Sequence, residues 1–239
     1  MNAIEVRNLT KQYKDFTLQD VTFTLPGGCI MGLVGENGAG KSTTIKLILN
    51  LVFPESGEIK IFGKDNKTDF EAVKEDVGVV FDEPCLPEMM TVKQTNLLMK
   101  NSYKNWEEET FFSHIKRFSL PENKEFKDFS RGMKMKLAIA AALSHRAKLL
   151  ILDEPTGGLD PIVRDEILDL FYEFIADENH SIFISSHIVS DLEKLCDYIA
   201  FLHKGKLLFC EEKDVLLEEY AVVKCAKEEM SLLPPEAVL

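Results

Sequence analysis

Residues 35–43 contain the side chains and the spacing that bind phosphate. They read GENGAGKST, which fits the pattern G-x-x-x-x-G-K-[ST]. The glycines let the backbone curl so that several N–H groups point at one anion. Lys41 adds a positive charge for the outer phosphates of a nucleotide, and Ser42 adds a hydroxyl for Mg²⁺. The stretch therefore predicts a nucleotide-binding loop, made of Gly35, Glu36, Asn37, Gly38, Ala39, Gly40, Lys41, Ser42 and Thr43.

Acidic and imidazole side chains follow two apolar runs further along the chain. Asp153 and Glu154 end the run at 149–152, and His187 follows the run at 181–185. Continuous apolar runs are typical of central parallel strands, and functional groups of such sheets gather at the carboxyl ends of the strands. Asp153 is then placed to hold Mg²⁺, and Glu154 to meet an attacking water. The alternative is that these residues are solvated turn residues.

Two further residues have both a binding and a structural interpretation. Ser130 precedes an Ala- and Leu-rich helical stretch that ends near His145. It is a natural N-cap, and the helix N-terminus it begins can face an anion or serve as a cap alone. Tyr13 lies between the first two predicted strands, where its ring can stack on a purine base or belong to a sheet edge.

The elements that position these groups alternate between strands and helices. The loop at 35–43 lies between a buried strand at 29–34 and a helix from 44, as phosphate-binding loops require. Alternating residues at 21–25 and a short run at 57–63 predict a smaller antiparallel sheet at the N-terminus. Further strands are expected at 77–81, 149–154, 181–185, 198–202 and 207–209. A helical pattern runs from 91 to 116, and helices are also expected after 130, after 161 and at 191–196. The fold class is therefore α/β, with a doubly wound, mostly parallel sheet.

Composition sets limits on the class of protein. The chain has 239 residues, 45% of them hydrophobic, and a net charge of −12. This balance indicates a globular protein and argues against a general nucleic-acid-binding surface. No apolar run reaches the roughly 18 residues that a membrane-spanning helix needs, and no secretory signal is recognisable. The five scattered cysteines, at 29, 85, 196, 210 and 225, are expected to be reduced thiols.

Taken in order, these motifs resemble the ATP-binding cassette of ABC transporters, in particular the ATPase subunits of the two-component exporter class. The resemblance covers about residues 4–217. Residues 35–43 match Walker A, and 149–154 match Walker B with its catalytic glutamate. Gly158, Leu159 and Asp160 resemble the D-loop, and residues 129–133 resemble the signature motif. The resemblance implies a P-loop NTPase fold with an N-terminal antiparallel β-subdomain and a helical subdomain at about 84–146.

The same resemblance implies roles for individual residues. Tyr13 matches the aromatic residue that stacks on adenine, and His187 matches the switch histidine that contacts the γ-phosphate. Ser130, Arg131 and Gly132 of the signature would complete the ATP site of a second subunit, and Asp160 of the D-loop would also bind ATP. Lys41, Glu154 and His187 would carry catalysis, and Ser42, Asp82 and Asp153 would hold Mg²⁺.

The sequence departs from the family pattern at two places. The signature is usually LSGGQ, whereas residues 129–133 read FSRGM, so Arg131 replaces the first glycine. The position of the Q-loop glutamine is occupied by Asp82, which is shorter and charged. Asp82 can still approach Mg²⁺ with an oxygen atom, but the usual coupling geometry of this loop is then in question.

The expected function is ATP hydrolysis that powers a membrane exporter of peptides, drugs or other amphipathic compounds. The expected cofactors are ATP and Mg²⁺. Transmembrane permease subunits would dock near residues 83–105, and a second ATPase subunit, identical or paralogous, would complete the sites. Such a protein is cytoplasmic and peripheral on the cytoplasmic face of the membrane.

The alternatives are an importer subunit and a soluble ABC ATPase such as a DNA-repair motor or a translation factor. A repair motor would carry a long coiled coil between Ser42 and Ser130, but the 88-residue interval is filled by a strand and a short helical subdomain. The tail at 218–239 has no assignable role.

Overall fold

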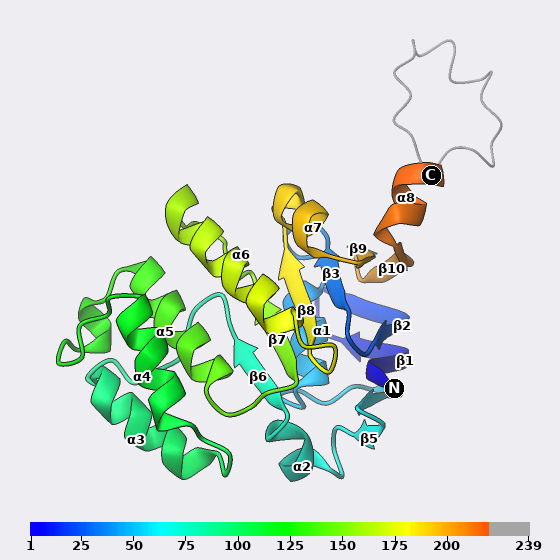
Figure 1. Cartoon of the computed structure of the whole chain (residues 1–239). Helices are drawn as coiled ribbons and strands as arrows, with labels where there is room; N and C mark the ends of the chain where they lie inside the picture. Colours follow the sequence, from blue (N-terminus) through cyan, green and yellow to red (C-terminus); the bar gives the residue numbers. More distant parts are fainter. Residues whose placement is uncertain (220–239) are drawn as a thin grey trace, which may run out of the picture.

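The computed structural model describes residues 1–219, and residues 220–239, with most of the expected tail, lie outside the described part. Its centre is a six-stranded sheet in the order β10-β9-β3-β8-β7-β6 (Figure 1). The strands are β3 (Ile30–Val34), β6 (Val77–Val80), β7 (Leu149–Asp153), β8 (Ser181–Ser186), β9 (Tyr198–His203) and β10 (Lys206–Glu212). All neighbours are parallel except β9 and β10. The predicted mostly parallel sheet is confirmed.

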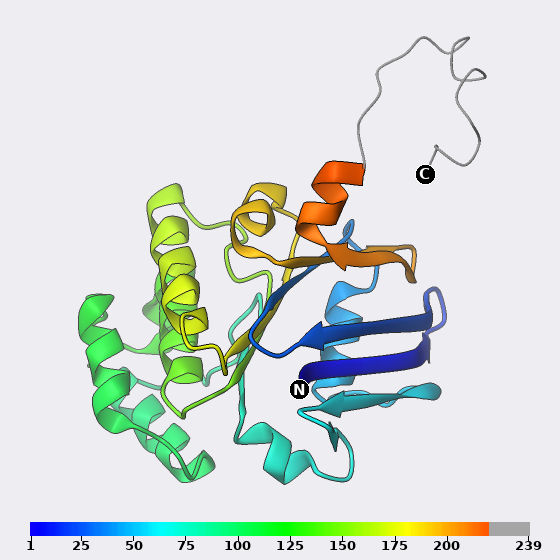
Figure 2. The ribbon, with the colours of Figure 1, turned by 45° about the vertical axis from the view of Figure 1, so that its right-hand side comes forward.

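A second, antiparallel sheet is formed by the N-terminal part of the chain. Its order is β2-β1-β4-β5, from β1 (Asn2–Gln12), β2 (Thr17–Pro26), β4 (Ser56–Ile61) and β5 (Lys64–Asp65). Figure 2 shows β1 and β2 side by side. Helix α1 (Lys41–Ile48) buries Ile45, Leu47 and Ile48 in the same hydrophobic core as the inward side chains of this sheet. The predicted N-terminal β-subdomain is confirmed.

The remaining helices lie mainly in the middle and C-terminal parts of the described chain. They are α2 (Phe70–Lys74), α3 (Val92–Ser102), α4 (Glu108–Arg117), α5 (Arg131–Leu143), α6 (Pro161–Ile175), α7 (Val189–Leu195) and α8 (Lys213–Glu219), with a 3-10 turn at Phe126–Asp128. Helices α3 to α5 form the helical region between β6 and β7 (Figure 1). None of the helices among residues 1–219 is long and apolar enough to cross a membrane.

Strand β7 shows how the sheet separates two cores. Its residues are all buried. Leu150 and Leu152 face the core shared with α4 to α7, whereas Leu149 and Ile151 face the core shared with α1 and the antiparallel sheet. Successive side chains of a strand point to opposite faces, so an entirely apolar run is required where both faces are covered. The packing on both faces holds the end of β7, and therefore Asp153 and Glu154, in a fixed position.

The helical pattern expected from 91 to 116 forms two separate helices, α3 and α4. Thr91 caps α3 with a capping box to Gln94, but the helix ends at Ser102, and Tyr103 after it is extended. The Glu107 backbone N–H donates to the Ser144 carbonyl at 2.7 Å, and the Lys104 N–H donates to Glu75 at 3.1 Å. These tertiary hydrogen bonds replace helical ones, so the chain turns before α4 begins.

The cysteine prediction is confirmed for the described residues. Cys29, Cys85, Cys196 and Cys210 are free, and Cys225 lies outside the described part. Burial raises the pKa of Cys196 to about 12, so this thiol acts as a small core residue.

Candidate functional site

The loop between β3 and α1 forms the floor of the largest candidate site. Gly40 precedes α1 with a φ of 114°, in the left-handed region that favours glycine. Gly35 passes so close to β9 that a Cβ atom there would lie 2.4 Å from the Leu202 carbonyl oxygen. Both glycines are therefore fixed by backbone geometry, and the loop leads directly into the N-terminus of α1, where an anion is stabilised.

Lys41 is held within this loop. Its side chain is only 6% exposed, and its ammonium donates to the Gly35 carbonyl at 2.8 Å and lies 3.3 Å from a carboxylate oxygen of Glu154. A buried cation needs such partners because it has lost water. The ammonium thus lies beside the cavity above the loop, and its contact with a phosphate stays a prediction.

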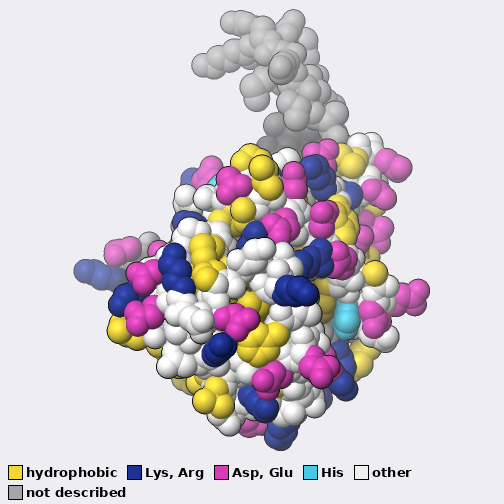
Figure 3. Space-filling view, turned by 60° about the vertical axis from the view of Figure 1, so that its left-hand side comes forward, with side chains coloured by type: hydrophobic (Ala, Val, Ile, Leu, Met, Phe, Trp, Pro, Cys, Tyr) yellow, Lys and Arg dark blue, Asp and Glu magenta, His cyan; other side chains and the backbone are white. Residues whose placement is uncertain are grey.

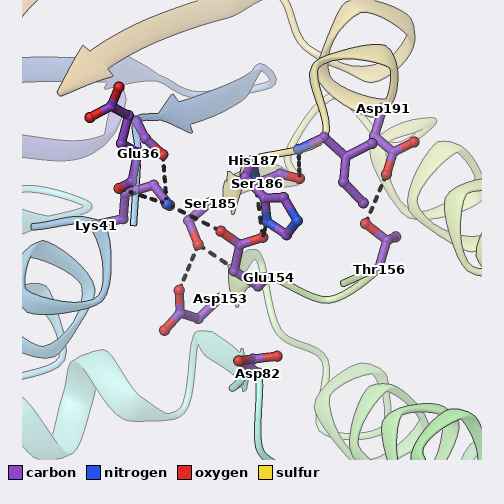
Figure 4. Close-up of polar contacts among 12 residues, drawn as sticks. Glu36, Lys41, Asp82, Asp153, Glu154, Thr156, Ser185, Ser186, His187 and Asp191 are labelled. Atoms are coloured by element: carbon purple, nitrogen blue, oxygen red, sulfur yellow. Dashed lines mark hydrogen bonds and ion pairs between the residues drawn. The ribbon is translucent and has the colours of Figure 1, made fainter. Parts of the chain in front are cut away.

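Glu154 and His187 reach the same space from the ends of β7 and β8. Glu154 has a φ of 50°, which is unusual for a residue with a side chain and is found at functional sites. Its Oε2 atom lies 2.7 Å from His187 Nδ1 and accepts the His187 backbone N–H at 3.2 Å. Figure 4 shows Lys41, Glu154 and His187 pointing toward one another. Three elements distant in sequence thus place a cation, a carboxylate and an imidazole within contact distance.

Asp153 lies deeper, with 5% of its surface exposed. Its Oδ1 accepts a hydrogen bond from the Ser185 hydroxyl at 2.6 Å, and Ser185 also accepts the Glu154 backbone N–H (Figure 4). Ser185 therefore orients both acidic residues. It was missed by sequence reasoning, although its position near the end of an apolar strand was a usable signal.

A cavity of about 790 Å³ joins Lys41, Glu154 and His187, and Asp153 does not line it. Its volume is that of a small-ligand site. The predicted site residues that line it are Glu36, Asn37, Gly38, Gly40, Lys41, Ser42, Thr43, Asp82, Arg131, Glu154 and His187. Gly35 and Ala39 belong to the same loop without lining the cavity.

The turn between β1 and β2 contributes residues other than the predicted one. Asp15 and Phe16 line the cavity, whereas Tyr13 does not. Tyr13 is 42% exposed and donates its backbone N–H to the Phe16 carbonyl at 2.8 Å. The Phe16 ring packs against Gly40, because a Cβ atom added to Gly40 would lie only 2.8 Å from the ring. Phe16 was not singled out from the sequence, and stacking of Tyr13 on adenine stays a prediction.

The signature residues surround a second, smaller cavity of about 270 Å³. Ser130, Gly132 and Asp160 line this cavity and not the larger one. Ser130 caps α5 by accepting the Met133 N–H at 3.3 Å, and Asp160 caps α6 by accepting the Val163 N–H at 3.1 Å. The predicted N-cap at Ser130 is confirmed.

Arg131 is the signature residue that lines both cavities. Its Nη2 atom donates to Asp82 Oδ1 at 2.5 Å. The two side chains are 50% and 48% exposed. Asp82 and Arg131, which both depart from the family pattern, are therefore in contact, although 49 positions separate them.

A buried carboxylate connects the segment after Glu154 with the helix after His187. Asp191 of α7 is 2% exposed and accepts hydrogen bonds from the Thr156 hydroxyl at 2.8 Å and from Arg164 Nε at 2.7 Å. Figure 4 shows the contact between Thr156 and Asp191. A fully paired buried charge of this kind fixes both segments. Sequence reasoning did not identify it.

The chain resembles several known proteins in sequence and in structure. The sequence pattern of the family described as "ABC transporter" matches residues 18–157. The bacitracin transport ATP-binding protein BcrA of Enterococcus faecalis is 36% identical over 209 residues, which are 86% of this chain and 68% of that protein. The lantibiotic transport ATP-binding protein SrtF of Streptococcus pyogenes is 36% identical over 215 residues, 88% of this chain and 91% of that protein. A solved structure described as the ATP-binding subunit of an ABC transporter has a TM-score of 0.84 and 30% identity, and the match covers 96% of this chain and 98% of that one.

Proposed function

Because the chain belongs to the ABC transporter family, and is an ATP-binding and ATP-hydrolysing member of it, we propose that it is the motor subunit of a membrane exporter. The observation that carries this proposal is the convergence of Lys41, Glu154 and His187 above the phosphate loop. The relatives named for bacitracin and lantibiotic transport favour peptides or other amphipathic compounds as cargo.

The geometry supports hydrolysis by attack of water on the γ-phosphate. Lys41 exchanges part of its contact with Glu154 for the phosphate and neutralises its charge. Glu154 is then free to orient the water and accept its proton. His187, held 2.7 Å from Glu154 by its Nδ1 atom, donates to the γ-phosphate and keeps the glutamate in place.

The donor set near the loop fits Mg²⁺. Ser42 supplies a hydroxyl and Asp153 a carboxylate, which are the hard oxygen ligands this ion prefers. Among residues 1–219, no three His, Cys, Asp or Glu side chains are grouped to hold a metal ion by themselves, so the phosphates and water would supply the remaining ligands. When bound, Mg²⁺ would neutralise phosphate charge. Asp82 can join this set only by leaving Arg131.

We further propose that two chains share each ATP site. Ser130, Gly132 and Asp160 surround a cavity separate from their own chain's phosphate loop, and Ser130 is exposed at the N-terminus of α5. Helix N-termini bind anions, so this surface suits the phosphates held by a second chain. The ATPase domain comprises residues 1–217, with the helical subdomain at about 84–146.

Permease subunits are the proposed membrane partners. The helical region exposes apolar side chains, among them Met89 at 62% and Leu97 at 60%. Figure 3, which brings this side of the molecule forward, shows hydrophobic groups among charged ones at the surface. Leu51 and Phe53 are likewise 57% and 68% exposed. Contiguous exposed apolar surfaces mark interaction sites, and we propose that the permease covers the exposed apolar side chains near residues 83–105 and holds the chain at the cytoplasmic membrane face.

Transport by the complete complex tests this proposal. Inside-out membrane vesicles that contain the chain and its permease should accumulate a fluorescent cationic peptide in the lumen when ATP is added. The same vesicles with Glu154→Gln should bind ATP without accumulating peptide. ATP-dependent loss of peptide from preloaded vesicles would instead indicate an importer, and an ATPase activity that no permease alters would indicate a soluble ABC ATPase.

A further inference from the structure

Asp82 and Arg131 come from the two ends of the helical region and meet at the phosphate-binding cavity. Asp82 follows β6, where the chain leaves the central sheet, and Arg131 is the first residue of α5, which returns toward it. The contact of 2.5 Å lies within one chain, and both side chains line the cavity that contains the phosphate loop. The guanidinium of Arg131 is therefore already placed in its own chain's cavity.

A second contact fixes the orientation of the Arg131 side chain. Its guanidinium lies against the backbone turn at Gly157 and Gly158. A Cβ atom added to Gly158 would lie 3.4 Å from Arg131 Cζ, which is ordinary van der Waals contact. Gly158 has a φ of 67°, and the Gly157 N–H donates to the Glu154 carbonyl at 3.1 Å. The turn is thus bonded to the proposed base, and Arg131 packs on it. An ordered guanidinium loses less entropy when it forms further hydrogen bonds.

The charges around the cavity make the ion pair exchangeable. Lys41 is buried against Glu154, whereas Arg131 and Asp82 are about half exposed. An exposed ion pair between single charges is weak. A terminal phosphate has more charge and more acceptor oxygens than a carboxylate, and guanidinium binds it with two parallel hydrogen bonds. ATP entering the cavity therefore competes with Asp82 for Arg131.

We propose that Arg131 is a phosphate-binding residue of its own chain's ATP site, and that Asp82 is its exchangeable counter-ion. This inference rests on the proposed function, because it requires ATP in the cavity. It adds a contact within the chain to the expected action of the signature motif on a second chain. Without ATP, Asp82 holds Arg131 near the turn at 157–158; with ATP, the guanidinium moves to the terminal phosphate.

Binding by the monomeric chain separates this contact from any contact between chains. ATP, ADP and AMP are titrated in Mg²⁺-containing buffer by isothermal calorimetry, at a protein concentration where light scattering shows a monomer. Arg131→Met should weaken ATP binding about tenfold or more, because a charged hydrogen bond is lost and Asp82 is left beside the phosphates. ADP should be affected less, and AMP not at all, since the contact is to the terminal phosphate.

Asp82→Asn tests the counter-ion part of the proposal. It should tighten ATP binding by several-fold, because the guanidinium is released. The change in affinity of the double variant should differ from the sum of the two single changes, and this deviation from additivity would show that the two residues are coupled. Arg131→Lys should restore part of the affinity. Arg117→Met is the matched control, since Arg117 pairs with Glu173 on the surface at 2.6 Å and should leave binding unchanged.

Two results would overturn the inference. Wild-type ATP affinity in monomeric Arg131→Met would restrict Arg131 to a partner's site. Unchanged affinity in Asp82→Asn together with purely additive effects in the double variant would remove the counter-ion role. A failure of the ATP site on which the proposed function rests gives a different result, because the wild-type chain and Arg117→Met would then bind no ATP either.

Discussion

The two ends of the site differ in how their polar groups are held. The phosphate-loop end consists of residues 35–43 with Glu154 and His187, and the signature end consists of residues 130–133 with the turn at 157–160. Lys41 is 6% exposed, and it is bonded within the loop and to Glu154. Ser130 is exposed, and the Arg131 side chain is 50% exposed. The first end has its cation and its proposed base within one chain. The second end exposes the N-terminus of α5 at the surface. A site shared between two chains requires such an exposed group.

The largest effect is expected at the buried end. Lys41→Ala should weaken ATP binding about 100-fold or more, because a desolvated charge is lost from the phosphates and Glu154 loses its partner. Calorimetric titration with Mg-ATP measures it. Lys46→Ala is the matched control, because Lys46 lies exposed on the same helix. Unchanged affinity in Lys41→Ala would remove the phosphate-loop assignment.

Glu154→Gln should separate binding from catalysis at the same end. The amide keeps the shape and accepts hydrogen bonds, but it cannot take a proton, so kcat should fall roughly 100-fold to 10,000-fold while ATP still binds. Steady-state ATPase and gel filtration with ATP measure turnover and the closed dimer. Glu178→Gln, at an exposed position, should behave as wild type. Normal turnover in Glu154→Gln would place the base elsewhere.

Thr156→Val probes the connection between the two ends. It removes one donor to the buried Asp191 and keeps the side-chain shape. The free energy of unfolding should fall by about 1–3 kcal/mol. Single-turnover hydrolysis should slow by about tenfold, because the segments that follow Glu154 and His187 are no longer fixed together.

Thr156→Ser keeps the hydroxyl and should restore single-turnover hydrolysis. A rate that falls equally in the serine variant would assign Thr156 to packing alone.

The smallest effect concerns stability at low pH, away from both ends. Burial lowers the pKa of His145, although the carbonyls of Val77 and Ala141 oppose this. On acidification, His145 takes up its proton near pH 6.5 in the unfolded chain, and at a lower pH in the folded chain. The contribution of neutral His145 to the free energy of unfolding is therefore complete above about pH 6.5 and is lost as the pH falls below it. The loss is at most about 1.4 kcal/mol per pH unit.

Thermal unfolding of wild type and His145→Gln between pH 8 and pH 5 measures this. The variant should lose less stability on acidification. Burial also lowers the pKa of His114, which remains in the variant, so only the difference between the two profiles belongs to His145. Parallel profiles would contradict the assignment.

The buried end was predictable from the sequence, and the contacts between segments were not. The apolar runs that end in Asp153 and His187 reveal parallel strands, because both faces of such strands are covered. The pattern at 35–43 by itself predicts the phosphate-binding loop, because its glycines are required for the backbone to curl around phosphate. In contrast, the contact between Asp82 and Arg131 joins positions with no periodic relation, and the break after Tyr103 depends on hydrogen bonds to Glu75 and Ser144.

The most direct test of the shared site mixes two inactive variants. Ser130→Arg fills the space at the N-terminus of α5 and leaves its own phosphate loop intact, whereas Lys41→Ala does the opposite. In a mixed dimer, one site combines the intact loop of the first chain with the intact signature of the second. Single-turnover hydrolysis in the mixture should therefore cleave one bound ATP, although each variant alone cleaves none. If mixed dimers form, as shown by co-purification of two different tags, and no ATP is cleaved, the two chains do not share the site.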